Sequence, residues 1–161
     1  MDENKRRRVA KMYDKYANDI YKYLYSYGRD KELAEDLLAD TFVRAMRSID
    51  RFDFDQPRAW LYTIARNLLR DHWKKKSTLA LDEKIEIVDT SDSIEEKLDK
   101  KISHEKLELA IKTLPSREAD IIRLRFIQNF SVKEVAKIVN VSPENVRIIQ
   151  YRALKRLKGA L

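Results

Sequence analysis

The sequence predicts an all-α protein with two small helical domains joined by a flexible acidic linker. Turn-forming residues are scarce, because 161 residues contain only two glycines and three prolines, and all-β folds need many more. Hydrophobic residues make up 43% and charged residues 38% of the chain, a balance that is typical of amphipathic helices and too apolar for a disordered chain. Apolar side chains also recur at three- and four-residue spacing along most of the sequence.

Composition excludes several classes of protein. The chain has no cysteine, which excludes a disulfide scaffold, a thiolate zinc site, an iron–sulfur cluster and a cysteine nucleophile. No 18 apolar residues run together, and no apolar stretch follows the basic start MDENKRRRVAK. We therefore expect a soluble, cytoplasmic protein without a membrane span, a secretory signal or a cofactor.

Charge divides the chain into three parts. Lys and Arg number 18 against 13 Asp and Glu in residues 1–81, 2 against 8 in residues 82–99, and 14 against 6 in residues 100–161. The acidic part lacks aromatic residues and cannot bury enough apolar surface to fold alone. We predict helical domains at residues 1–78 and 105–161, with a linker at residues 79–104. Two basic domains favour a polyanionic partner such as nucleic acid, although a basic surface can also serve solubility alone.

The carboxy-terminal domain has the spacing of a helix-turn-helix. Ser131 and Glu134 match a capping box, and Val132–Val139 then place apolar residues on one helical face. Ser142 and Pro143 start a second helix as N-cap and first-turn proline. Two short helices joined by a tight turn are typical of DNA-binding proteins. A capped helical hairpin with a solvated basic face is the alternative.

A helical wheel separates two faces of the second helix of this motif. The side that we expect to be buried carries Val146, Ile149, Ala153, Leu154 and Leu157. The helix start and the outward side supply the candidate DNA contacts Ser142, Asn145, Arg147, Ile148, Tyr151, Arg152 and Lys155. Ile148 on a basic face suits a thymine methyl group, and an arginine suits a guanine edge or a phosphate. An upstream helix from Leu114 to Phe126 is expected to complete the core. The residues through which we expect it to pack are Ile121, Ile122, Leu124, Arg125 and Phe126.

The amino-terminal domain begins with two predicted helices. The first contains six tyrosines between Tyr13 and Tyr27 and ends at Gly28, and the spacing of most of them favours core packing over base stacking. Asp30 caps the second helix, whose apolar stripe runs from Ala34 to Ile49. The opposite face of this helix carries Glu35, Asp36, Asp40, Arg44 and Arg47. That face suits either the helix dipole or a docked protein.

A third helix, opened by Pro57, combines aromatic and basic residues. The set around its start is Arg51, Phe52, Phe54, Arg58, Trp60 and Tyr62, with Arg66 and Arg70 further along. Rings stack on unpaired bases and cations hold a nucleic-acid backbone, so the cluster is suited to a single strand. Each ring taken alone also fits a core position. His72 falls on the apolar side of the helix, where we expect a packed ring.

Three segments of the chain form a recognisable set: AEDLLADTFVRA from Ala34 to Ala45, RAWLYTIARN from Arg58 to Asn67, and the final module from Leu114 to Leu157. Together they resemble the extracytoplasmic-function (ECF) group of the sigma-70 family of RNA polymerase sigma factors. The three segments occur in the family's order, with an acidic segment before the last one. Together they cover both predicted domains. The chain departs from the family pattern at Ala39-Asp40 and at Ile148-Ile149, and the second departure concerns which upstream sequence is read.

The resemblance implies a function in promoter recognition. The first domain would be region 2, which binds the clamp of the polymerase's largest subunit through Glu35, Asp36, Asp40 and Arg44. Region 2 would also capture the −10 element through Phe52, Phe54, Arg58, Trp60, Arg66, Asn67 and Arg70. The second domain would be region 4, which reads the −35 element through the helix from Ser142 and holds the β flap. An anti-sigma factor, often membrane-anchored in this family, would be a further partner.

Two other functions account for part of the sequence. A stand-alone DNA-binding regulator would explain the helix-turn-helix but not the aromatic and basic cluster around Pro57. A metal-dependent nuclease would have to use Glu35, Asp36 and Asp40, but Glu35 and Asp36 diverge by about 100° on their helix. The only histidines, His72 and His104, lie in different predicted domains. We therefore expect no enzyme.

Overall fold

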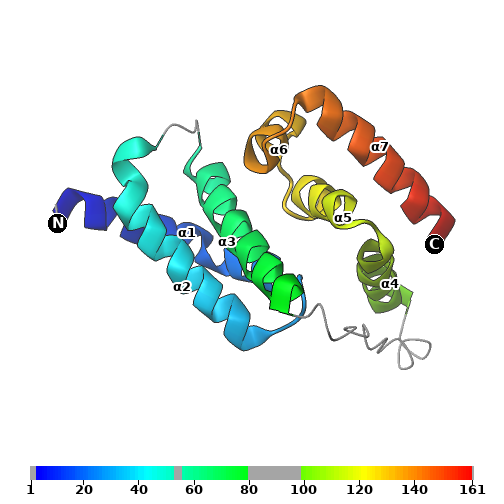
Figure 1. Cartoon of the computed structure of the whole chain (residues 1–161), viewed down its shortest axis with the longest axis horizontal. Helices are drawn as coiled ribbons and strands as arrows, with labels where there is room; N and C mark the ends of the chain where they lie inside the picture. Colours follow the sequence, from blue (N-terminus) through cyan, green and yellow to red (C-terminus); the bar gives the residue numbers. More distant parts are fainter. Residues whose placement is uncertain (1–2, 53–55, 80–98, 161) are drawn as a thin grey trace. The chain divides into compact units, whose positions relative to one another are not determined.

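The computed structural model describes residues 3–52, 56–79 and 99–160, and every regular element in these ranges is a helix (Figure 1). The prediction of an all-α protein is confirmed. The chain forms two compact units that divide between Asp82 and Glu83. Most of the predicted acidic linker, residues 80–98, lies outside the described residues.

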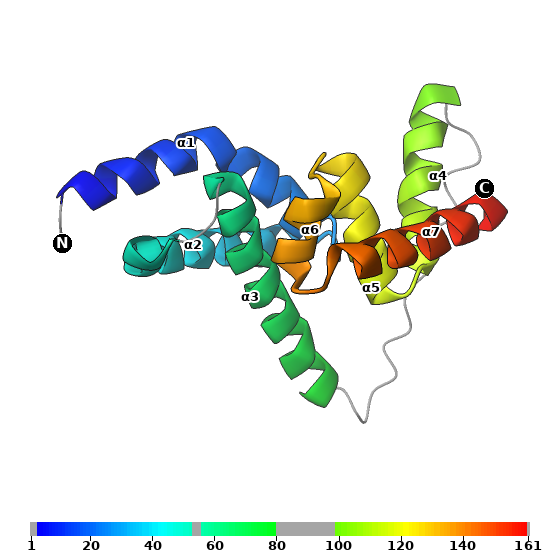
Figure 2. The ribbon, with the colours of Figure 1, turned by 90° about the horizontal axis from the view of Figure 1, so that it is seen from above.

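The first unit contains helices α1 (Glu3–Tyr25), α2 (Lys31–Ser48) and α3 (Pro57–Leu79), with a short 3₁₀ turn η1 (Ile49–Arg51) after α2. Each of the three long helices packs on the other two (Figures 1 and 2). Pro57 begins α3 as predicted, since its missing N–H costs nothing in the first turn.

Aromatic and aliphatic side chains from all three helices form the core of the first unit. Ile20 and Tyr23 of α1 and Leu61 and Tyr62 of α3 are at most 1% exposed, and the Tyr23 and Tyr62 ring centroids lie 5.2 Å apart. The stripe of α2 that the spacing predicts is buried or half-buried throughout. Two tyrosines of α1 are exposed: Tyr13 is 48% exposed and meets Phe42 only edge-on, and Tyr25 is 37% exposed.

The connection between α1 and α2 depends on a glycine. Gly28 has φ +136°, a conformation that side chains rarely adopt, and Arg29 follows at φ +54°. A Cβ atom on Gly28 would lie 3.2 Å from Cζ2 of Trp73 on α3. The Asp30 side chain then accepts a 3.1 Å hydrogen bond from the Leu33 N–H, which confirms the predicted cap.

The second unit contains helices α4 (Asp99–Thr113), α5 (Ser116–Ile122), α6 (Val132–Val139) and α7 (Pro143–Ala160). A π-helical turn, η3 (Arg123–Ile127), continues α5. Helix α4 begins at Asp99, inside the predicted linker at residues 79–104. Helix α7 packs against α4, α5 and α6.

The core of the second unit joins α4, α5 and α7. Its members are Ala110, Ile111, Leu114, Ala119, Ile122, Ala153 and Leu157, with Leu107 and Ile127 packed against it. Sequence spacing correctly predicts that Ile121, Ile122 and Leu124 are buried, but Phe126 is 47% exposed. The π turn accounts for this error, because its extra residue breaks the 3.6-residue periodicity on which the prediction rests.

Caps define the two helices of the predicted helix-turn-helix. The Glu134 N–H donates to Ser131 Oγ at 3.1 Å and the Ser131 N–H donates to Glu134 Oε1 at 2.9 Å, which completes the capping box. Helix α6 ends at Val139, and its C-cap Asn140 has a left-handed φ of +58° that turns the chain toward α7. The Asn145 N–H then donates to Ser142 Oγ at 3.1 Å, so Ser142 caps α7 as predicted.

The glycine at the α1–α2 connection yields a first prediction. Gly28→Ala should destabilise the first unit by about 1–3 kcal/mol, because alanine would adopt a strained φ and crowd Trp73. Both tryptophans, Trp60 and Trp73, belong to this unit, so urea unfolding followed by tryptophan fluorescence reports on it selectively. Gly159→Ala, in the second unit, is the control for a glycine-to-alanine change outside the first unit, and it should leave the tryptophan-detected midpoint unchanged because a Cβ atom added there would have no neighbour within 4 Å. An unfolding midpoint for Gly28→Ala at or above that of wild type would contradict this account.

Burial of Tyr62 yields a second prediction. Desolvation raises the pKa of the Tyr62 phenol well above its ordinary value. Above about pH 10 the unfolded chain therefore releases a proton that the folded chain keeps, so Tyr62 makes stability fall by at most ~1.4 kcal/mol per pH unit. Below that pH its contribution to stability is fully present. In urea titrations from pH 8 to pH 11, Tyr62→Phe should flatten the decline, and Tyr25→Phe, at an exposed site, should not. Equal slopes for Tyr62→Phe and wild type would refute the assignment.

Candidate nucleic-acid interface

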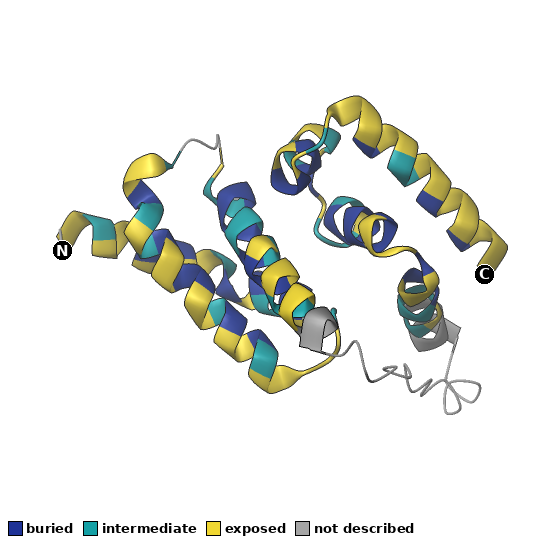
Figure 3. Ribbon diagram, in the orientation of Figure 1, coloured by how far each residue is buried: buried dark blue, intermediate teal, exposed yellow. Residues whose placement is uncertain are grey.

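The outer face of α7 is the most extensive candidate for DNA contact. Val146 and Ala153 are fully buried and Leu157 is 5% exposed, so they turn one side of α7 toward the core (Figure 3). The predicted contact residues are all exposed; they are Ser142, Asn145, Arg147, Ile148, Tyr151, Arg152 and Lys155. Sequence reasoning therefore identified the outward side of this helix correctly at each of these positions.

Chemically, this face combines apolar and cationic groups. Ile148 is 48% and Tyr151 is 68% exposed, and the cations Arg147, Arg152 and Lys155 lie around them. An isoleucine offers contact to a thymine methyl group, while guanidinium groups donate to guanine edges or phosphates. The Ser142 hydroxyl accepts from the Asn145 N–H and keeps its own proton to donate to a phosphate.

Two positions of α7 differ from the prediction. Leu154, predicted to be buried, is 41% exposed, and Ile149 is half-buried. Leu154 lies about 80° around the helix from Val146, at the edge of the buried arc.

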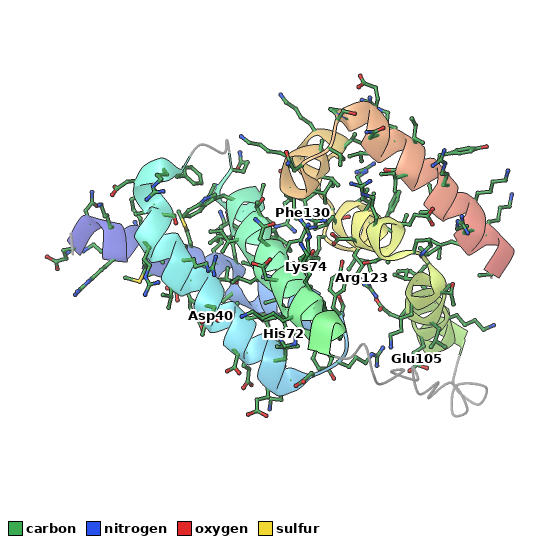
Figure 4. All side chains as sticks on the ribbon, in the orientation of Figure 1. Asp40, His72, Lys74, Glu105, Arg123 and Phe130 are labelled. Carbon is green, nitrogen blue, oxygen red and sulfur yellow. The ribbon has the colours of Figure 1, made fainter. Side chains whose placement is uncertain are left out.

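The outer face of α2 is a second candidate surface. Glu35, Asp36, Asp40 and Arg44 are all exposed there, and Asp40 is labelled in Figure 4. Sequence reasoning missed Val43, which is 45% exposed in the same face. A helical wheel places Val43 opposite the buried stripe, and that position was the available signal.

The aromatic residues before and within α3 are less exposed than a stacking platform requires. Trp60 is only 6% exposed, and its ring meets Phe52 edge-on with the centroids 4.9 Å apart. Tyr62 is fully buried. The four consecutive residues from Ala59 to Tyr62 are all buried, so this first part of α3 is covered on every side. Trp60 therefore takes the core position that the sequence left open, and it does not offer a free ring face to a base. Phe52 is half-buried, and Phe54 lies outside the described residues.

Arg58 is held against the core of the first unit. Its guanidinium lies 5.2 Å from the centre of the Tyr62 ring and is hydrogen-bonded to Tyr62. This contact stabilises the ring and leaves Arg58 half-buried. Arg58 therefore supports the start of α3 in addition to any contact that it makes with DNA.

The remaining candidates of the first unit lie along α3. Asn67 and Arg70 are exposed at a spacing of three residues, which places them on one face of the helix, whereas Arg66 is half-buried. His72 is half-buried, with its ring edge-on to Trp73 at 5.8 Å, as expected for a packed ring.

Metal ligation and membrane insertion each need a recognisable arrangement of residues. Among the described residues, no three His, Cys, Asp or Glu side chains come together as ligands for a metal ion. No helix in the described ranges has the length and apolarity needed to cross a membrane.

Comparisons with known proteins match both units. The family model described as sigma-70 region 2 matches residues 12–78, and the model described as sigma-70, region 4 matches residues 110–159. The ECF RNA polymerase sigma factor SigM of Bacillus subtilis is 30% identical over 94% of this chain and 93% of its own length. BldN, an ECF sigma factor of Streptomyces coelicolor, is 34% identical over 94% of this chain, which spans 60% of the length of BldN.

Solved structures share the fold. The sigma factor RpoE in complex with the anti-sigma factor NepR from Bartonella quintana matches with a TM-score of 0.76 at 23% identity and covers 94% of each chain. CnrH in complex with the cytosolic domain of CnrY matches with a TM-score of 0.70 at 22% identity, over 96% of this chain and 87% of that one. From the two matching regions and the full-length similarity to SigM, we conclude that this chain belongs to the ECF group of the sigma-70 family of RNA polymerase sigma factors.

Proposed function

We propose that this chain is a promoter-specificity subunit. It binds core RNA polymerase and brings its first unit to the −10 element and its second unit to the −35 element. It also helps to open the duplex at the −10 element. The polymerase supplies the catalysis, so the chain itself is not an enzyme. Its place of action is then the cytoplasm, where the polymerase and its DNA template meet.

The observation that carries this proposal is the outer face of α7. All seven predicted contact positions are exposed on a capped helix whose opposite side is buried. That combination of exposed cations and apolar groups suits the major groove, which admits an α-helix and presents base edges together with thymine methyl groups.

For the −10 element, the proposal uses the first unit. Phe52 and Phe54 would contact an unpaired base, Asn67 and Arg70 the neighbouring duplex, and Trp60 supports Phe52 from within the core. Extracting a base from its stack costs about a few kcal/mol, which stacking and pocket contacts can offset. We assign Arg58 and Arg66, which are half-buried, to backbone contacts at the edge of this surface.

For polymerase binding, the proposal uses the outer face of α2. Exposed Glu35, Asp36, Asp40 and Arg44 would contact the clamp of the largest subunit. Exposed Val43 gives this charged face an apolar centre, which is where binding energy concentrates in protein interfaces. The second unit would contact the flap of the β subunit.

We also propose an anti-sigma factor as a partner. Support comes from the two solved neighbours, of which one is a sigma factor bound to an anti-sigma factor and the other is bound to the cytosolic domain of its partner. Since the second neighbour's partner binds through a cytosolic domain, we propose that the anti-sigma factor of this chain could itself be anchored in a membrane. Such a protein would compete with polymerase or DNA for the exposed faces of α2 and α7.

A reconstituted transcription assay tests the proposed function. Core RNA polymerase with and without the chain is supplied with a library of genomic fragments, and the transcript starts are sequenced. We expect chain-dependent starts that share two upstream sequence elements. DNA binding without chain-dependent starts would instead indicate a stand-alone regulator and would refute the proposal.

The α2 surface yields a third prediction. The double variant Asp36→Arg/Asp40→Arg should weaken binding to core polymerase by about ten- to a hundredfold. The two arginines would face the cationic groups that the proposal pairs with the aspartates, and such like-charge contacts cost about 1–3 kcal/mol or more. Both side chains are exposed, so the fold should be unaffected. Asp14→Arg/Asp19→Arg, at two exposed positions of α1, changes the net charge by the same amount and is the control. The assignment of α2 fails if the α2 variant binds as tightly as this control.

A further inference from the structure

Arg125, in the π turn of the second unit, joins the two helices of the helix-turn-helix. Its Nε donates to Gln150 Oε1 at 2.9 Å, and its Nη1 donates to the Phe130 carbonyl at 2.7 Å. Its guanidinium also lies 5.2 Å from the centre of the Phe126 ring. Because a guanidinium has only donors, the amide oxygen of Gln150 must face it.

The two hydrogen-bonded partners, Phe130 and Gln150, lie just before the start of α6 and in the middle of α7. Phe130 is fully buried and immediately precedes Ser131, the N-cap of α6 (Figure 4). Gln150 is half-buried in the middle of α7 and directly precedes Tyr151, a candidate DNA contact that is 68% exposed. One side chain therefore ties the start of α6 to the centre of the helix that we assign to base contact.

The π turn places Arg125 for this contact. The Gln128 N–H donates to the Arg123 carbonyl at 2.9 Å, and the Phe130 N–H donates to the Leu124 carbonyl at 3.0 Å. Asn129 adopts φ +61° and reverses the chain between them. The π segment thus holds Phe130 at both of its polar backbone atoms, through Leu124 and through Arg125.

These hydrogen bonds supply a constraint that the apolar core does not. Burial of Val146, Ala153 and Leu157 decides which side of α7 faces inward, but apolar contact is non-directional and tolerates small rotations. Charge-assisted hydrogen bonds are short and directional. Base contacts in the major groove need donor–acceptor distances correct to a few tenths of an ångström, so a small error in the rotation of α7 would weaken several of them together.

We propose that Arg125 is a positioning residue for recognition of the upstream promoter element: through Gln150 and Phe130 it sets the rotation of α7, and Gln150 itself contacts no base. This inference rests on the proposed function. It assigns roles to two residues that lie outside the predicted DNA-contact set.

A double-mutant cycle tests the inference with the full chain bound to core polymerase. Binding is measured to a promoter duplex selected by the wild-type holoenzyme and to the same duplex with a scrambled upstream element. Arg125→Ala should lower the ratio of the two affinities by about tenfold, as expected for a loss of specific base contacts. Gln150→Ala should also lower this affinity ratio. The double variant Arg125→Ala/Gln150→Ala should lower the ratio no further than Arg125→Ala does, because the two single changes remove the same constraint.

Arg156→Ala is the matched control. Arg156 is an exposed arginine of α7 that pairs with Glu118 at 3.3 Å and is not a candidate DNA contact. Arg156→Ala changes the net charge by the same amount as Arg125→Ala. It should leave the affinity ratio within about twofold of wild type, since the loss of one charge weakens binding to both duplexes alike. Additive losses in the double variant, or an unchanged ratio in folded Arg125→Ala, would overturn the inference.

Two measurements keep the test decisive. Circular dichroism establishes that each variant is folded, and if Arg125→Ala is not, Arg125→Lys replaces it, because lysine keeps the charge but cannot span both acceptors. An unchanged ratio in folded Arg125→Lys and Gln150→Ala then overturns the inference. Wild-type holoenzyme that fails to distinguish the two duplexes refutes the proposed function itself, and this outcome is separate from any result with the variants.

Discussion

Burial of Val146, Ala153 and Leu157 against the second unit's core determines which side of α7 is available to a partner. Each of the larger side chains contributes about 1.5–3 kcal/mol by leaving water. Turning α7 by half a turn would expose all three and drive Lys155 into the core, at a far greater cost. The cationic and apolar outer face is therefore a direct consequence of core packing, and assignment of the helix to DNA depends on it.

The same constraint organises the first unit. Leu37, Thr41 and Ala45 face inward on α2, so Asp36 and Asp40 must face outward. Each unit consists of a few helices that bury one side only, which leaves the other sides as contact surfaces. A sigma factor that holds a polymerase and a promoter at once needs separate surfaces for them, and we propose that the exposed helical faces of the two units supply these surfaces.

Local spacing predicted the features that local interactions determine. The capping box of Ser131 and Glu134, the cap at Asp30 and the proline start of α3 are all present. Features that depend on distant neighbours were not predictable in this way. Trp60 is buried because Phe52 and the core cover it, and the bond between Arg125 and Gln150 joins residues 25 positions apart across a π turn that no periodicity indicates.

The central claim is that two separately folded units act on one promoter while bound to one polymerase. The most direct measurement is the yield of start-site-specific transcript as base pairs are inserted between the two promoter elements. Because both units are anchored to the same enzyme, an insertion of about five base pairs, half a helical turn, should reduce the yield by about tenfold or more. A yield that does not change with this insertion, or with replacement of the upstream element, would contradict the claim.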